Sequence, residues 1–262
     1  MNLHDYWNGM TVVGLIVSLG AGIVRGFSGF GFSALTVAGI SLFMAPAALV
    51  PAVLVLEILA GISVWRAGVR DLDMGWLKSL VIGNAFLVPV GVYLLAHLDP
   101  VLLRLIVGCA LLLTATGLRW RSTHPLHTNP RVQAVTGVLS GLLNGLAASG
   151  GVAAALLMAA CHVPALAMRG TLITYVTFAC GYTLLWASAF SQGSGSGIDV
   201  FSAETVRWIL VLSPGMLLGM RLGRAVFARS NPDGFRLLVL NLLIGISGLS
   251  VARALFDWLV PH

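Results

Sequence analysis

Long stretches of this chain contain almost no charged side chain, and this feature most restricts the folds it can adopt. Residues 80–95 carry no charge, and residues 47–64 carry only Glu57. A run of about 20 apolar residues has the length of a helix that crosses a bilayer. Over all 262 residues, 58% are hydrophobic and 9% are charged, whereas soluble domains have about 25% charged residues. The sequence therefore predicts an all-α integral membrane protein.

We expect roughly 8–10 helical segments in this membrane protein. A polar stretch at 121–131 divides them, so we predict a first transmembrane repeat at 1–120, a cytoplasmic linker at 121–131 and a second transmembrane repeat at 132–262. The apolar segments lie at roughly 10–27, 31–45, 48–66, 76–97 and 100–119 in the first half, and at roughly 132–147, 150–161, 165–190, 204–228 and 234–258 in the second.

A spaced motif that occurs twice is the sign of the two repeats. In each half a glycine is followed by a proline and then by an arginine at the same spacing, as Gly91, Pro100 and Arg104 and as Gly223, Pro232 and Arg236. Internal repeats in an apolar chain are typical of transporters built from two related halves, with the binding site where the halves meet.

The beginnings of the two halves also align. Gly22-x-x-Arg25-Gly26 matches Gly141-x-x-Asn144-Gly145 at an offset of 119 residues, whereas the later motif has an offset of 132 residues. The difference is close to the length of a Ser/Gly-rich loop, 191–199, that occurs only in the second half. Chance similarity between apolar helices is the alternative interpretation.

The loop charges predict the orientation of the segments. Arginine and lysine concentrate in the loops at 66–78, 119–131 and 221–236, and they are absent from the N-terminus and from 191–203. Basic loops face the cytoplasm, so we expect both termini on the periplasmic side. With five segments in each half, the second half is inverted relative to the first. The N-terminus has no basic region of a signal peptide, so we expect the first helix to remain in the membrane.

Glycine-rich breaks interrupt both halves at matching positions, at 26–31 and 147–151. The segments around each break are too short for two full crossings, so we expect broken or re-entrant helices there. A helix that begins inside the membrane presents unpaired N–H groups and the positive end of its dipole, which suits an anion. The candidate substrate-binding residues are Arg25, Ser28, Gly29, Gly31, Ser33, Asn144, Ser149, Gly150, Gly151 and Thr171. Tight helix packing by the glycines and an interfacial position for Arg25 are the alternatives.

Glu57 is an ionisable residue in the middle of an apolar segment, and such a residue is by default a functional candidate. It is our candidate for carrying a coupling proton, although it could also pair with Arg25 or serve as a neutral hydrogen bonder. Arg169, at the start of the eighth segment, either draws anions inward or follows the positive-inside rule.

Several other classes of function find no support in the sequence. The basic residues are scattered at segment ends, so we expect no nucleic-acid partner. The three cysteines have no metal-ligand spacing, and we expect neither a metal nor another cofactor. HExxH, GxSxG and phosphate-binding GxxxxGK[ST] motifs are absent, so we expect no enzyme and no ATP hydrolysis by this chain.

A glycine-rich stretch followed by an apolar helix and a proline occurs twice, at 26–46 and at 145–164. This pattern resembles the sulfite exporter TauE/SafE family of membrane permeases. The resemblance implies a multi-pass protein of the bacterial inner membrane that moves sulfite, organosulfonates or other organic anions. The first copy departs from the usual glycine triplet, because Phe27, Phe30 and Phe32 lie between or beside the glycines, where they either line a pocket or face lipid.

We therefore predict a secondary transporter for small anions that works by alternating access, coupled to a proton or a sodium ion. The lipid bilayer is its environment, and a homodimer is a possible assembly. An anion channel and a permease for another small organic anion are the alternatives.

Overall fold

The computed structural model describes residues 3–40, 42–44, 46–68, 72–120, 127–194 and 202–229, together with scattered positions between 241 and 256. All regular elements within these ranges are helices, as the composition predicts. The helices are α1 (Leu3–Ser28), α2 (Phe32–Ile40), α3 (Pro46–Gly68), α4 (Met74–His97), α5 (Pro100–Trp120), α6 (Pro130–Ala147), α7 (Gly150–Ala160), α8 (Ala165–Ser194) and α9 (Ala203–Arg229).

These nine helices match the first nine expected segments closely. More than half of the tenth expected segment, 234–258, lies outside the described residues, as do Pro232 and Arg236 of the second motif and most of the 121–131 linker.

Local capping explains where two of the helices begin. The carboxylate of Asp73 accepts hydrogen bonds from the N–H groups of Gly75 and Trp76, at 3.0 and 3.2 Å, at the start of α4. Asn129 accepts one from the N–H of Val132 at 2.8 Å, and Pro130 occupies the first turn of α6. Both caps satisfy N–H groups that a helix start leaves without partners, and proline lacks the N–H that would need one.

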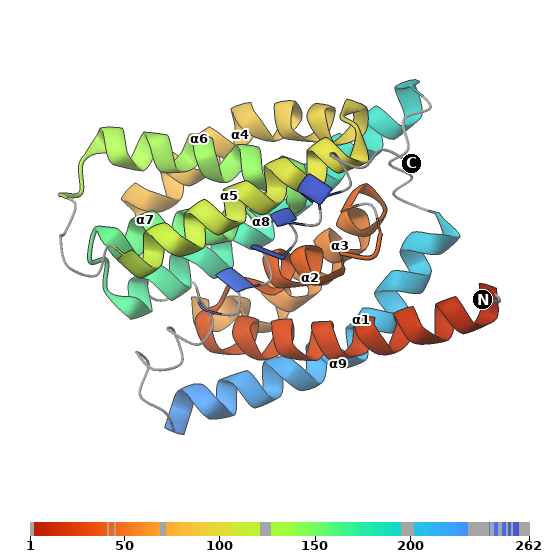
Figure 1. Ribbon diagram of the computed structural model, residues 1–262. Coiled ribbons are helices and arrows are strands. Elements are labelled where there is room, and N and C mark those ends of the chain that lie inside the picture. Colours follow the sequence, from red (N-terminus) through yellow and green to blue (C-terminus); the bar gives the residue numbers. More distant parts are fainter. Residues whose placement is uncertain are drawn as a thin grey trace.

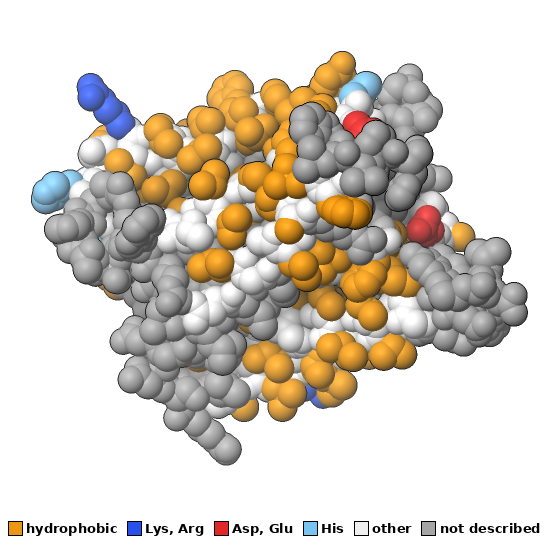
Figure 2. Space-filling model, in the orientation of Figure 1, with side chains coloured by type: hydrophobic (Ala, Val, Ile, Leu, Met, Phe, Trp, Pro, Cys, Tyr) orange, Lys and Arg blue, Asp and Glu red, His pale blue; other side chains and the backbone are white. Residues whose placement is uncertain are grey.

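The helices are apolar on their outer sides as well as inside, which identifies lipid as their environment. Four of them are long and apolar enough to cross a membrane, within Gly9–Ser28, Met74–His97, Leu166–Phe190 and Ala203–Ala225. The most exposed large hydrophobic side chains on their outer surfaces and on α5 are 66–72% exposed, namely Ile16, Phe86, Leu113, Leu185 and Leu210. Figure 2 shows hydrophobic side chains spread over the middle of one face of the molecule. A soluble protein does not expose so much apolar surface.

Two parallel helix pairs form opposite edges of the molecule. α1 lies along α9 at one edge and α4 lies along α6 at the other, and α2, α3 and α8 lie between the two pairs (Figure 1). α3 and α8 pack against each other in this central region. Within the described residues, α5 contacts α7 and α6, and it covers the central helices on one side (Figure 1).

Small residues make the close contact in both edge pairs. In α6, a β-carbon at Gly145 would lie 2.6 Å from the carbonyl oxygen of Val88 and 2.8 Å from the α-carbon of Gly91. In α1, a β-carbon at Gly22 would lie 2.7 Å from the carbonyl oxygen of Met216 and 3.2 Å from the α-carbon of Gly219. Backbones come this close only where small residues meet, which is the usual way that membrane helices associate.

The first glycine of the repeated motif therefore has a packing role. Gly91 lies in the α4–α6 contact and Gly223 lies in the α1–α9 contact, where each is buried against the backbone of the neighbouring helix. These two glycines therefore serve the packing of the two edge pairs.

Candidate functional site

Two helices, α2 and α7, are much shorter than the others. α2 has 9 residues and α7 has 11 residues, which correspond to lengths of about 13 and 16 Å. The hydrocarbon core is about 30 Å thick, so neither helix crosses it alone. Each follows a break in the chain at an expected position, at residues 29–31 and 148–149.

The backbone at both breaks adopts left-handed conformations. Gly29 and Gly31 have φ values of 83° and 94°, which glycine adopts without the steric cost that a β-carbon brings. At the second break the residue with positive φ is Ala148, at 52°. The first break thus depends on its glycines for its conformation, whereas the second reverses at an alanine and uses Gly150 and Gly151 for close packing.

A buried ion pair holds the first break. Nη2 of Arg25 in α1 lies 3.1 Å from Oε2 of Glu57 in α3, and the two side chains are 1% and 0% exposed. Nη1 of Arg25 donates a hydrogen bond to the carbonyl oxygen of Gly29. Oε1 of Glu57 accepts a hydrogen bond of 3.1 Å from the N–H of Ser33, in the first turn of α2. The carboxylate of Glu57 therefore occupies the anion position at the N-terminus of α2.

A second arginine lies at the same end of α1. Arg169 in α8 donates a hydrogen bond of 3.2 Å to the carbonyl oxygen of Gly26. The absent side chain of Gly29 leaves room for Arg169, because a β-carbon there would lie 3.0 Å from its Cγ. Arginines near the last carbonyl groups of a helix are favourable because that end carries a partial negative charge. Arg169 and the end of α1 are distant in sequence, so this contact was not expected.

The second break lies among neutral polar groups. Asn144 is completely buried, and its Nδ2 donates a hydrogen bond of 2.7 Å to Oγ1 of Thr183 in α8. Ser149 precedes α7, but its hydroxyl donates to the carbonyl oxygen of Ala147 at 2.8 Å and makes no hydrogen bond to the helix. Among the described residues, no side chain caps the start of α7.

A chain of hydrogen bonds connects α7 with α6, α8 and α4. The hydroxyl of Ser140 donates to the carbonyl oxygen of Gly150 at 2.5 Å and lies 2.8 Å from the hydroxyl of Tyr175. The Tyr175 hydroxyl lies 3.2 Å from Oδ1 of Asn84. All three side chains are completely buried. The sequence analysis did not single out these residues, although Asn84 is an isolated amide within the uncharged 80–95 stretch.

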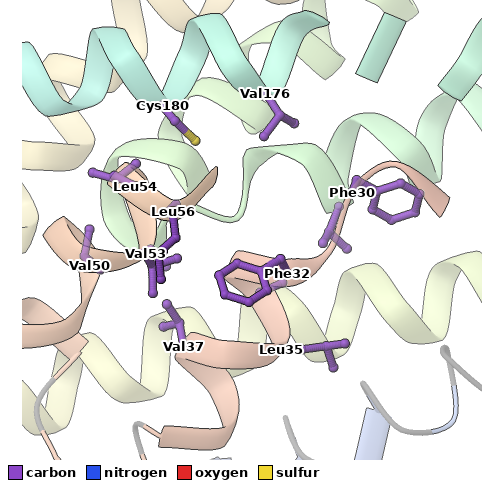
Figure 3. Close-up of a cluster of buried hydrophobic side chains, with 14 of the residues drawn as sticks. Phe30, Phe32, Leu35, Val37, Val50, Val53, Leu54, Leu56, Val176 and Cys180 are labelled. Carbon is purple, nitrogen blue, oxygen red and sulfur yellow. The ribbon is translucent and has the colours of Figure 1, made fainter. Parts of the chain in front are cut away.

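The two breaks contact each other. A β-carbon at Gly151 would lie 3.6 Å from Cβ of Phe30 and 2.7 Å from a methyl group of Val176. Figure 3 shows Phe30 and Phe32 on the chain around the first break, with Val176 and Cys180 on α8 nearby. Phe27, Phe30 and Phe32 are at most 9% exposed, so their interpretation as lipid-facing residues is wrong.

The hydroxyls of Ser28 and Thr171, two further predicted site residues, already form hydrogen bonds within the protein. The hydroxyl of Ser28 lies 2.8 Å from the carbonyl oxygens of Val24 and Phe30, within the first break. The hydroxyl of Thr171 accepts a hydrogen bond of 3.0 Å from the N–H of Asp73, just before α4. The structure thus brings the predicted residues of the two breaks together and places the Thr171 hydroxyl against the start of α4.

The helices thus form an apolar bundle in which the break before α2 and the start of α7 contact each other. Among the described residues, no group of three His, Cys, Asp or Glu side chains is placed to hold a metal ion. The model of the sulfite exporter TauE/SafE family matches residues 14–250, and the chain therefore belongs to this family of membrane permeases. No match was found among curated proteins or among solved structures.

Proposed function

We propose that this protein is a secondary transporter that moves sulfur-containing anions, such as sulfite or organosulfonates, across the bacterial inner membrane. The observation that carries the proposal is the contact between Phe30 and Gly151, which brings the two breaks together in the interior of the bundle. Helix starts that meet inside a membrane protein provide N–H groups and positive dipole ends for an anion. Membership of the TauE/SafE family supports the same class of substrate.

We also propose that the two halves are inverted repeats that rock against each other in alternating access. In these repeats α1 corresponds to α6, and α4 corresponds to α9. The α1–α9 contact at one edge then corresponds to the α4–α6 contact at the other. The offset of 119 residues brings Ser18, Gly22 and Gly26 onto Gly137, Gly141 and Gly145, and these residues line the two contacts. With the basic loops in the cytoplasm, both termini face the periplasm.

A proton is the coupling ion that this arrangement favours, and Glu57 is its carrier. The charged and titratable groups near Glu57 are Arg25 on α1 and Cys180 on α8, and Arg169 on α8 lies near Arg25. Protonation of Glu57 would leave Arg25 without a counter-charge beside the break, which favours the entry of an anion. A sodium ion finds no comparable set of oxygen ligands among these side chains.

Flux measurements in proteoliposomes test this function. We expect saturable sulfite or methanesulfonate uptake that is stimulated by the same anion on the other side of the membrane. Glu57→Gln should remove the acceleration by a pH gradient, while Arg221→Ala, at an exposed position on α9, should behave as the wild type. Flux that neither saturates nor shows counterflow would instead identify an anion channel. Transport of carboxylates but of no sulfur-containing anion would identify another organic-anion permease.

A further inference from the structure

The start of α7 is a buried helix N-terminus whose first N–H groups have no partner. Among the described residues, none accepts a hydrogen bond from the N–H groups of Gly150 or Gly151, and both glycines are buried. Ser149 directs its hydroxyl to Ala147 instead. Buried N–H groups are nearly always paired, with protein or with a bound molecule. This helix start is therefore incomplete without a ligand.

Two buried amide side chains near this helix start also lack partners. Nδ2 of Asn84 and Oδ1 of Asn144 make no hydrogen bond within the described structure, and both residues are 0% exposed. Asn84 is joined to Gly150 through the hydroxyls of Tyr175 and Ser140. Asn144 lies directly beside α7, because a β-carbon at Gly150 would be 2.8 Å from its Cβ.

Both amides can act as donors to a ligand. The oxygen and nitrogen of an asparagine are exchanged by a half-turn of the amide group. Asn144 can therefore accept a hydrogen bond from the Thr183 hydroxyl through its oxygen and turn its NH2 group away from Thr183. A buried polar group left unpaired is destabilising, so a molecule that pairs with several of them binds favourably.

The first half of the chain shows what kind of group completes such a helix start. At α2 the N–H of Ser33 donates to the carboxylate of Glu57, the protein's own anion. The position that corresponds to Glu57 at an offset of 119 is Val176, an apolar residue that packs on Gly151. One helix start is thus filled by an internal carboxylate, and at the other none is found within the described part of the chain.

We propose that the transported anion binds at the start of α7, in the position that the Glu57 carboxylate takes at α2. The N–H groups of Gly150 and Gly151 and the amides of Asn84 and Asn144 hold it. This assignment rests on the proposed function and specifies its site. All four are neutral donors, and Arg25 is already paired with Glu57. A dianion loses much more hydration energy on burial than a monoanion. Protonation of Glu57 would free one positive charge, that of Arg25, which balances a monoanion and not a dianion. The site therefore selects monoanions that carry an –SO3 group.

Thermal unfolding of the purified full-length protein in detergent tests this site. Methanesulfonate is the monoanion probe and sulfate the dianion, both compared at equal ionic strength. A ligand that binds the folded state raises the unfolding midpoint with the logarithm of its concentration. We expect methanesulfonate, and not sulfate, to stabilise the wild type. Asn84→Asp, which has the same shape but places a carboxylate in the site, should weaken apparent affinity at least tenfold.

Two further variants make the result decisive. Asn144→Ala removes the second amide without adding charge and should also weaken affinity, which covers the case in which Asn84→Asp does not fold. Thr36→Val is the matched control, because the Thr36 hydroxyl is buried and unpartnered but lies in α2, and it should respond as the wild type.

Each outcome separates this proposal from the proposed function. Suppose that both asparagine variants bind methanesulfonate as the wild type does and that Glu57→Gln loses binding. The site would then lie at α2, and this inference would be overturned while the proposed anion transport would stand. Stronger stabilisation by sulfate would overturn the selection of monoanions. No transport and no stabilisation of the wild type by any anion would overturn the proposed function itself.

Discussion

The buried pair of Arg25 and Glu57 gives the sharpest test of what holds the first break together. The two charges lie 3.1 Å apart and are 1% and 0% exposed, so removing either one leaves the other as an uncompensated buried charge. Such single changes cost about 3–5 kcal/mol, whereas replacing both partners by apolar residues of similar size is often nearly neutral. We therefore expect strong coupling between Arg25→Met and Glu57→Leu.

The two single variants should differ in a definite direction. Without Arg25, the carboxyl group of Glu57 can take up a proton and become neutral, so we expect a cost near 3 kcal/mol. Without Glu57, the guanidinium of Arg25 stays charged, so we expect a cost near 5 kcal/mol. The double variant still loses the hydrogen bonds to Gly29 and Ser33, for which we expect about 2–3 kcal/mol in total. The coupling energy is then about 5 kcal/mol.

Thermal unfolding in detergent measures these differences. A fluorophore that reacts with thiols reports unfolding, because Cys180 is completely buried. A loss of 3–5 kcal/mol should lower the midpoint by roughly 6–20 °C in a chain of this size. Arg221→Met, at an exposed position on α9, is the control and should stay within about 2 °C. If both single variants unfold close to the wild-type midpoint and their effects add in the double variant, the Arg25–Glu57 pair does not hold the first break together.

Two further predictions concern packing and capping. Gly22→Ala should destabilise the protein by about 2 kcal/mol or more, because its β-carbon would lie 2.7 Å from the carbonyl oxygen of Met216, whereas Gly20→Ala in the same helix meets nothing within 4 Å and should be neutral or stabilising. Equal midpoints for these two variants would contradict the close α1–α9 contact. Asp73→Ala should cost about 1 kcal/mol through loss of the α4 cap, while Asp73→Asn should retain most of it. The same thermal assay measures both, and an unchanged midpoint for Asp73→Ala would show that the cap does not stabilise α4.

Much of the architecture follows from the sequence, because the bilayer makes apolar length and glycine position informative. Charge-free runs located the membrane segments within a few residues, since a polar backbone in lipid must form helices. The glycine clusters located both breaks. Only the first depends on glycine for its backbone conformation, at Gly29 and Gly31, whereas the second has its positive φ at Ala148. Arg25 and Glu57 could be recognised as candidate functional residues, because an ionisable residue in an apolar membrane segment is energetically costly.

The tertiary structure alone decided how these residues meet. Glu57 and Arg25 pair because α3 passes beside the end of α1, and Arg169 joins that end from α8. The network through Ser140, Tyr175 and Asn84 consists of residue types that are common in helix packing. The sequence by itself determined that the chain has two glycine-rich breaks, at 26–31 and 147–151. Only the packing of distant helices decided that one is filled by the protein's own carboxylate and the other is not, because hydrogen bonds between helices depend on contacts that sequence spacing does not encode.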